Sequence, residues 1–154
     1  GEHLHDPQGL EGTPGTSVGL GWLKIDTTLE AEKQLRNVRG HLCLPGAALM
    51  TGYEIHLGVS QGEDLNRPLV RLDDEGRTDG ACSADGQVMG SYCHGLFDQP
   101  EALTALLAWA GCAETIQVDF VARREADLNR LADAVEQNLD WQKLDQILQE
   151  SQHA

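Results

Sequence analysis

The chain has 154 residues, and 11 basic against 25 acidic side chains give it a formal net charge of −14 at pH 7. This length is enough for one domain with a hydrophobic core. Because the charge is strongly negative, we expect no binding to nucleic acid or to an anionic membrane surface. No apolar run approaches the roughly 20 residues that a membrane-spanning helix needs.

The placement of cysteine and histidine gives little support to a metal site. The four cysteines contain no C-x-x-C pair, and we expect them to be free thiols of a cytoplasmic protein. His3 and His5 share an i, i+2 spacing and could be joined by His153. We expect both ends of the chain to be flexible, so we predict no metal there.

The first two-thirds of the chain has the pattern of loops and strands. Residues 1–20 are rich in Gly and Pro and predict a loop, and residues 73–86 predict a polar turn region. Elsewhere, alternation of apolar and polar residues and punctuation by Gly or Pro predict extended segments. The predicted strands are residues 20–29, 33–39 (the weakest), 51–57, 69–72 and 87–93.

The remainder of the chain has a helical pattern. Asp98 is expected to cap a helix that has Pro100 in its first turn and ends at Gly111. Apolar stripes with helical spacing predict a second helix from about residue 122 and a short last helix capped by Asp140. We expect all three stripes to be core.

The order of these elements indicates the fold class. Strands followed by helices indicate an α+β fold or part of an α/β domain. We favour the α/β class, because the chain has the pattern of the second half of something larger, with one domain portion over residues 1–150 and a tail at 151–154. The chain does not begin with methionine. We therefore expect Gly1 to be a cut or processed end and the chain to be the later part of a larger domain.

His94 is the strongest candidate for a catalytic side chain. It follows the predicted strand 87–93 and precedes a helix, and loops at strand ends carry catalytic residues disproportionately. Gly90 and Gly95 flank it and permit close backbone approach. The imidazole could be a general base that activates a cysteine thiol, or a histidine satisfied at a strand end.

Cys93 is not expected to be the nucleophile that His94 activates. Neighbouring residues on a strand point to opposite faces, so the two side chains should diverge. We interpret Cys93 as a small buried hydrophobe. Cys43, Cys82 and Cys112 stand in no context typical of a reactive thiol.

A second polar group lies upstream of His94. Glu54 and His56 are at i and i+2 of a predicted strand, so they share one face, whereas Tyr53 and Ile55 take the other. Glu54 and His56 could be a plain cross-strand polar pair. Alternatively, they could orient a substrate or line a catalytic pocket, and with Tyr53 they are our candidate substrate-binding or orienting residues.

Two motifs in this order resemble a known family. Gly52–Gly58 (GYEIHLG) is similar to the G-Y-E-I-H-M-G segment of the glutamine amidotransferase domain of cobyric acid synthases, and Gly90–Asp98 (GSYCHGLFD) is similar to its G-T-Y-x-H-G-L-F-D histidine motif. Weaker matches extend the resemblance over nearly the whole chain; they are residues 9–12, 19–21, 26–28 and 127–139. The resemblance implies the C-terminal portion of a flavodoxin-like class I amidotransferase domain.

The resemblance also implies an activity. Such a domain hydrolyses glutamine through a cysteine thiolate, with His94 as the base, and supplies ammonia to an N-terminal synthase domain. That domain uses ATP and Mg²⁺ to amidate carboxylates of a corrinoid, adenosylcobyrinic acid a,c-diamide, in cobalamin biosynthesis. No G-x-x-x-x-G-K-[ST] phosphate loop is present in this sequence, so we expect no ATP site within it.

Two departures from a complete triad amidotransferase qualify these expectations. The cysteine elbow of the family would precede Gly1, so we expect the chain alone to lack glutaminase activity. Leu96 stands where other triad amidotransferases carry a glutamate, which fits this branch and leaves Glu54 as a candidate to orient His94.

The sequence leaves alternative functions open. The chain could belong to another cobyrinate-type or peptidoglycan-type amidotransferase, or it could be a non-catalytic binding module. An exposed sheet edge would favour pairing between copies.

Overall fold

The structure, a computed structural model, describes residues 1–74, 76–112 and 119–151. It falls into two units, residues 1–118 and 119–154, and each is described by itself. Among the described residues, all strands lie in the first unit, and those of the second unit form helices. Strands first and helices last confirm the predicted α/β class.

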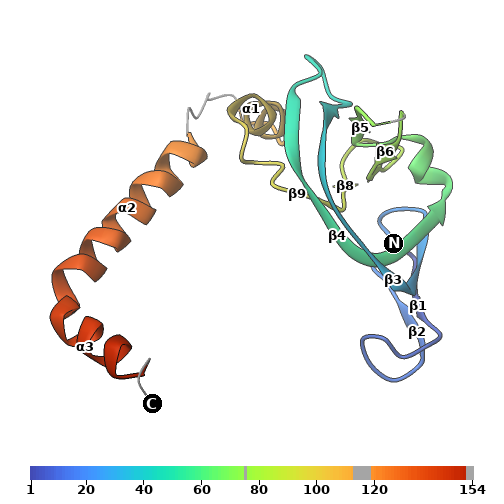
Figure 1. Cartoon of the computed structure of the whole chain (residues 1–154). Helices are drawn as coiled ribbons and strands as arrows, with labels where there is room; N and C mark the ends of the chain where they lie inside the picture. The colour runs from blue at the N-terminus through green and yellow to red at the C-terminus, as the bar shows by residue number, and fades with distance from the viewer. Residues whose placement is uncertain (75, 113–118, 152–154) are drawn as a thin grey trace. The chain divides into compact units, whose positions relative to one another are not determined.

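Two long antiparallel strands, β3 (Ile25–Leu42) and β4 (Leu49–Gly62), carry the sheet of the first unit (Figure 1). The sequence predicted separate strands at 20–29 and 33–39, but they form the single strand β3. The register shifts between Leu29 and Gln34, so a bulge absorbs the irregular residues and pairing with β4 continues beyond them. Pairing with β4 on both sides of this shift joins the two predicted segments into one strand, and sequence patterns over a few residues do not reveal pairing between distant segments.

The N-terminal segment is paired as well, so the loop predicted over residues 1–20 is wrong at two strands. β1 (His3–Asp6) runs parallel to β3 and antiparallel to β2 (Gly15–Val18). The sheet order is β2-β1-β3-β4-β9, where β9 is Cys93–His94. This mixed sheet places β4 directly beside the strand that carries His94.

The region between β4 and β9 holds short strands: β5 and β6 join this sheet, and β7 and β8 form a separate two-stranded sheet. A 3₁₀ helix, η1, leads into β5, which pairs with β3, and the segment predicted as a turn over 73–86 contains β6 and β7. The predicted strand 87–93 is divided into β8 and β9, because the N–H of Tyr92 is donated to the Asp79 carboxylate and not to a neighbouring strand. The bounds are η1 Glu63–Asn66, β5 Val70–Leu72, β6 Thr78–Asp79, β7 Ala81–Cys82 and β8 Met89–Gly90.

Helix α1 (Pro100–Trp109) closes the first unit. Its N-cap is Gln99, not the predicted Asp98, because the proline restricts the residue before it to an extended backbone. Gly111 follows the helix with a φ of +83°, the left-handed conformation predicted for the residue that ends it. The core lies between α1 and the strands; its buried members are Val38, Leu42, Met50, Leu69, Val70, Leu72, Cys93, Ala102 and Leu106.

The second unit contains α2 (Phe120–Asn138) and α3 (Trp141–Ser151). The predicted cap is confirmed, since the Asp140 carboxylate accepts the N–H of Lys143 at 3.0 Å. The prediction that the stripes of α2 and α3 are core is wrong, because α2 has no buried residue and the stripe of α3 is exposed, with Leu131 of α2 61% and Ile147 of α3 53% exposed. A pair of helices can bury only the little surface that the two share. None of the described helices is long and apolar enough to cross a membrane.

We predict that Gly52→Ala destabilises the first unit. A Cβ at Gly52 would lie 1.9 Å from the carbonyl oxygen of His94, so β9 would have to move away from β4. Overpacking of this kind costs about 1–3 kcal/mol or more in unfolding free energy. Urea denaturation measures the loss, with Gly12→Ala as the control because no atom lies within 4 Å of its Cβ position. Equal stability of the two variants would contradict the prediction.

Candidate functional site

The pairing of β4 with β9 brings the two sequence motifs together. Tyr53 lies opposite His94, and Glu54 lies opposite Cys93. Since residues opposite each other in an antiparallel pair share a face, Tyr53 and His94 lie on one face and Glu54 and Cys93 on the other. His94 is exposed and Cys93 is buried, as the alternation along the strand predicted.

Two contacts hold the His94 ring. Its Nδ1 lies 3.0 Å from the backbone carbonyl oxygen of Tyr92, and its ring stacks on Tyr53 with centroids 4.8 Å apart and planes inclined by 11°. A carbonyl oxygen can only accept, so Nδ1 carries the proton in this bond. The neutral imidazole therefore keeps Nε2 as an unprotonated acceptor, which is the form a general base requires.

Glu54 is a buried carboxylate held by two arginines. Its side chain is 4% exposed, and Arg36 Nε and Arg77 Nη2 each lie 3.3 Å from Oε2. Hydrogen bonds to Asp74, and secondarily to Glu54, raise the pKa of Arg77. Because Glu54 lies on the face opposite His94, it does not orient that ring; the Tyr92 carbonyl makes the contact predicted for Glu54.

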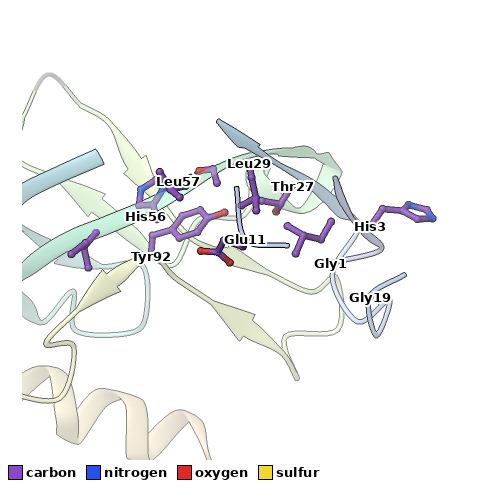
Figure 2. Close-up of a pocket in the computed structure, with 12 residues that line it drawn as sticks. Gly1, His3, Glu11, Gly19, Thr27, Leu29, His56, Leu57 and Tyr92 are labelled. Atoms are coloured by element: carbon purple, nitrogen blue, oxygen red, sulfur yellow. Dashed lines mark hydrogen bonds between the residues drawn. The ribbon is translucent and has the colours of Figure 1, made fainter. Parts of the chain in front are cut away.

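His56 lies on the same face as Glu54, as predicted, and lines two cavities. Its Nδ1 is 2.8 Å from the carbonyl oxygen of Gly58, and its ring stacks on Tyr92 at a centroid distance of 3.9 Å. Figure 2 shows these two rings at one cavity, of about 460 Å³. The second cavity, of about 560 Å³, is also bordered by Arg36 and Glu54. His94 borders neither cavity.

Asp79 organises the segment just before His94. It is 6% exposed, accepts the Ser91 hydroxyl, and accepts the N–H of Tyr92 at 3.2 Å. The Ser91 hydroxyl oxygen in turn accepts the N–H of Cys93 at 2.9 Å. The sequence analysis missed Asp79, since an acidic residue among glycines has the pattern of a surface turn.

The sequence analysis also missed three other residues of the site. They are Arg36 and Arg77, which contact Glu54, and Tyr92, which stacks on His56. Arg36 lies opposite Glu54 in the β3–β4 register, so strand pairing brings them together. Arg77 comes from the segment between β5 and β6. A partner of opposite charge for the glutamate was the one signal available, but sequence spacing could not choose among the eleven basic residues.

Cys93, the neighbour of His94 in the sequence, is a poorly reactive thiol. Burial, and then the neighbouring Asp79 carboxylate, raise the pKa of Cys93 to about 12. Burial also raises the pKa of Cys82, whereas Cys43 and Cys112 are exposed. A thiol that stays protonated at neutral pH is a poor nucleophile and a poor metal ligand.

Two groups of side chains in the described residues have the spacing of metal ligands. In the buried group, Glu54, Asp79 and Cys93, the glutamate is neutralised by arginines and the thiol is protonated, so it is unsuited to a cation. The second group, Glu2, His3 and Asp26, is at the surface, where an imidazole–carboxylate contact of 3.0 Å already joins His3 to Asp26.

Comparison with known families agrees with the geometry of the site. The family model of the CobB/CobQ-like glutamine amidotransferase domain matches residues 1–102. The match covers 102 of the 154 residues, so the chain belongs to this family. The matched span contains both motifs and the whole β3–β4–β9 arrangement, and it supports a glutamine amidotransferase function.

We predict that Glu54→Gln lowers stability because it leaves two guanidinium groups without their buried counter-charge. The expected loss is about 1–3 kcal/mol, below the range for fully buried pairs because both arginines reach solvent. The control is Glu63→Gln, which breaks an exposed pair with Lys24 and should cost at most about 0.5 kcal/mol. Chemical denaturation compares them, and equal losses would show that the Glu54 cluster contributes no more than a surface pair.

We predict that the folded protein exposes Cys43 and Cys112 to a thiol reagent at pH 8 and protects Cys93. With a pKa of about 12, roughly one Cys93 in ten thousand is a thiolate at that pH, and the side chain is buried. Peptide mapping after labelling gives the rates, and the same labelling in denaturant is the control. Labelling of Cys93 as fast as Cys112 would refute this assignment.

Proposed function

We propose that the chain is the later part of the glutamine amidotransferase domain of a cobyric acid synthase, with His94 as its general base. The observation that carries this proposal is the His94 ring, exposed and held at Nδ1 so that Nε2 is an acceptor. Membership of the CobB/CobQ-like family supports the glutaminase chemistry. The sequence of the GYEIHLG motif, Gly52–Gly58, favours cobyric acid synthase within that family.

In the proposed reaction, Nε2 of His94 takes the proton of a cysteine thiol. The thiolate attacks the side-chain amide carbon of glutamine, and the imidazolium returns the proton as ammonia leaves and a thioester forms. Nε2 then takes a proton from water, whose oxygen attacks the thioester and releases glutamate and the thiol. The bond from Nδ1 to the Tyr92 carbonyl supports the transient imidazolium throughout.

The thiol of this reaction is proposed to come from outside the 154 residues. Cys93 lies on the wrong face of β9 and stays protonated. Among the described residues, no contact joins His94 to a cysteine side chain. The open face around Tyr53 and His94, where Tyr53 is 44% exposed, can accept a segment that carries the nucleophile.

The partners of the complete enzyme follow from the same proposal. Glutamine would bind at the His94 face, and the ammonia would pass to a synthase domain that uses ATP and Mg²⁺ to amidate a corrinoid acid. Neither ATP nor Mg²⁺ is assigned to residues of this chain. The end strands of the sheet, β2 and β9, are the places where copies would pair, which sedimentation velocity at several concentrations would test.

A related amidotransferase is the second candidate, since the family match covers CobB-like and CobQ-like domains alike. Such an enzyme would use the same His94 chemistry on a different acid, such as cobyrinate or a peptidoglycan precursor. Amidation assays of the complete enzyme with each acid would separate the two. Product formed from cobyrinate or a lipid-linked peptidoglycan precursor, but not from adenosylcobyrinic acid a,c-diamide, would favour the second candidate.

We predict that the isolated 154-residue chain releases no ammonia from glutamine, whereas the complete enzyme does. In the complete enzyme, His94→Ala should lower turnover by roughly a hundredfold or more, the scale of a general base. His41→Ala is the matched control, because His41 is a half-exposed histidine of β3 that contacts Asp73. Near wild-type turnover of His94→Ala would reduce His94 to a structural histidine.

A further inference from the structure

The β4–β9 pair carries two histidine–tyrosine stacks of the same construction. The outer pair is Tyr53 with His94, and the inner pair is Tyr92 with His56. Each strand segment supplies one tyrosine and one histidine, and each tyrosine stacks on the histidine of the other segment. Each histidine also has Nδ1 within 3.0 Å of a backbone carbonyl two residues away.

The carbonyl contact alone does not define the direction of Nε2 in the outer pair. One hydrogen bond at Nδ1 anchors one atom of an exposed ring, which can still tilt about that anchor. The face of Tyr53, nearly parallel to the imidazole and 4.8 Å away, restricts the remaining tilt. Anchor and stacking face together leave one orientation of the ring.

The backbone that carries the Tyr53 ring is held on both sides in the sheet. β4 lies between β3 and β9 in the sheet, and Tyr53 is paired with Asn37 on one side and His94 on the other. Gly52 allows β9 to approach, since a Cβ there would overlap the His94 carbonyl. Thus, in the GYEIHLG motif, Gly52 allows β9 to lie close to β4, and Tyr53 supplies the aromatic surface for His94.

We propose that Tyr53 is a positioning residue that sets the plane of the His94 ring and so the direction of Nε2. The aromatic face of Tyr53 positions the His94 ring, and the Tyr53 hydroxyl is not needed for this positioning. The positioning is a property of the chain itself, and its effect on turnover rests on the proposed function above. Tyr53 therefore acts on the reaction through His94 and not through contact with glutamine.

The first test is ¹⁵N NMR of the His94 ring in the 154-residue chain. Wild type and Tyr53→Phe should show one tautomer, protonated at Nδ1, with a well-ordered ring. Tyr53→Leu, which keeps an apolar side chain on the strand but removes the stacking face, should show a mobile ring that is still protonated at Nδ1, because the Tyr92 carbonyl remains. His56→Gln breaks the inner pair on the opposite face and should leave the His94 signals unchanged.

Backbone amide spectra of Tyr53→Leu establish that the variant is folded, and Tyr53→Val is the second variant if it is not. Unchanged ring order in a folded variant without the aromatic face would overturn the proposal. A change of His94 in His56→Gln as large as in Tyr53→Leu would overturn it too, because the effect would then be general loosening of the strand pair.

Kinetics of the complete enzyme give the second test. A ring misplaced by about 1 Å can cost about a hundredfold, so Tyr53→Leu should lower kcat by roughly tenfold to a hundredfold with KM nearly unchanged, and Tyr53→Phe should restore it. A raised KM with unchanged kcat would overturn the proposal by making Tyr53 a substrate contact. An enzyme without any glutaminase activity would refute the proposed function alone, and the NMR result would still decide the role of Tyr53.

Discussion

The candidate site depends on the close approach of two short backbone segments, Gly52–Glu54 of β4 and Cys93–His94 of β9. Only two residue pairs form this ladder, yet they determine which side chains meet. Gly52 makes the approach sterically feasible, and Asp79 holds the residues that lead into β9. A small change in this approach would move the candidate base, because His94 itself is one of the paired residues.

The alternation of side chains across this ladder separates two kinds of chemistry. One face carries an exposed imidazole on an aromatic ring, where a proton can be exchanged with a bound molecule. The other face carries the Glu54 carboxylate, which is paired with two arginines, and the Cys93 thiol, which is buried and protonated. Pairing and burial make these groups unreactive. The charged cluster is therefore best understood as structural support that stabilises β4 beneath the residues of the open face.

The chain belongs to an amidotransferase family, yet no described residue places a suitable thiol beside His94, and this arrangement accommodates both findings. The family chemistry needs an imidazole acceptor and a thiolate, and the described residues supply the first in a well-defined form. The face on which that acceptor lies is open, so a thiol from another segment can reach it without disturbing the core. The imidazole proposed as the base is thus organised by the residues of this chain independently of a nucleophile.

Several features could be predicted from local chemistry alone: the α/β class, the position of His94 at a strand end, its divergence from Cys93, the helix end at Gly111 and the cap at Asp140. Each follows from side-chain alternation, helical spacing or capping, which involve residues a few positions apart. Four other features became visible in the folded chain and not in its sequence: residues 1–20 contain strands, β3 is continuous, Glu54 pairs with Arg36 and Arg77, and the Tyr92 carbonyl holds His94. These features arise from backbone pairing and burial between segments far apart in the chain, and the geometry of such contacts is not contained in any local pattern.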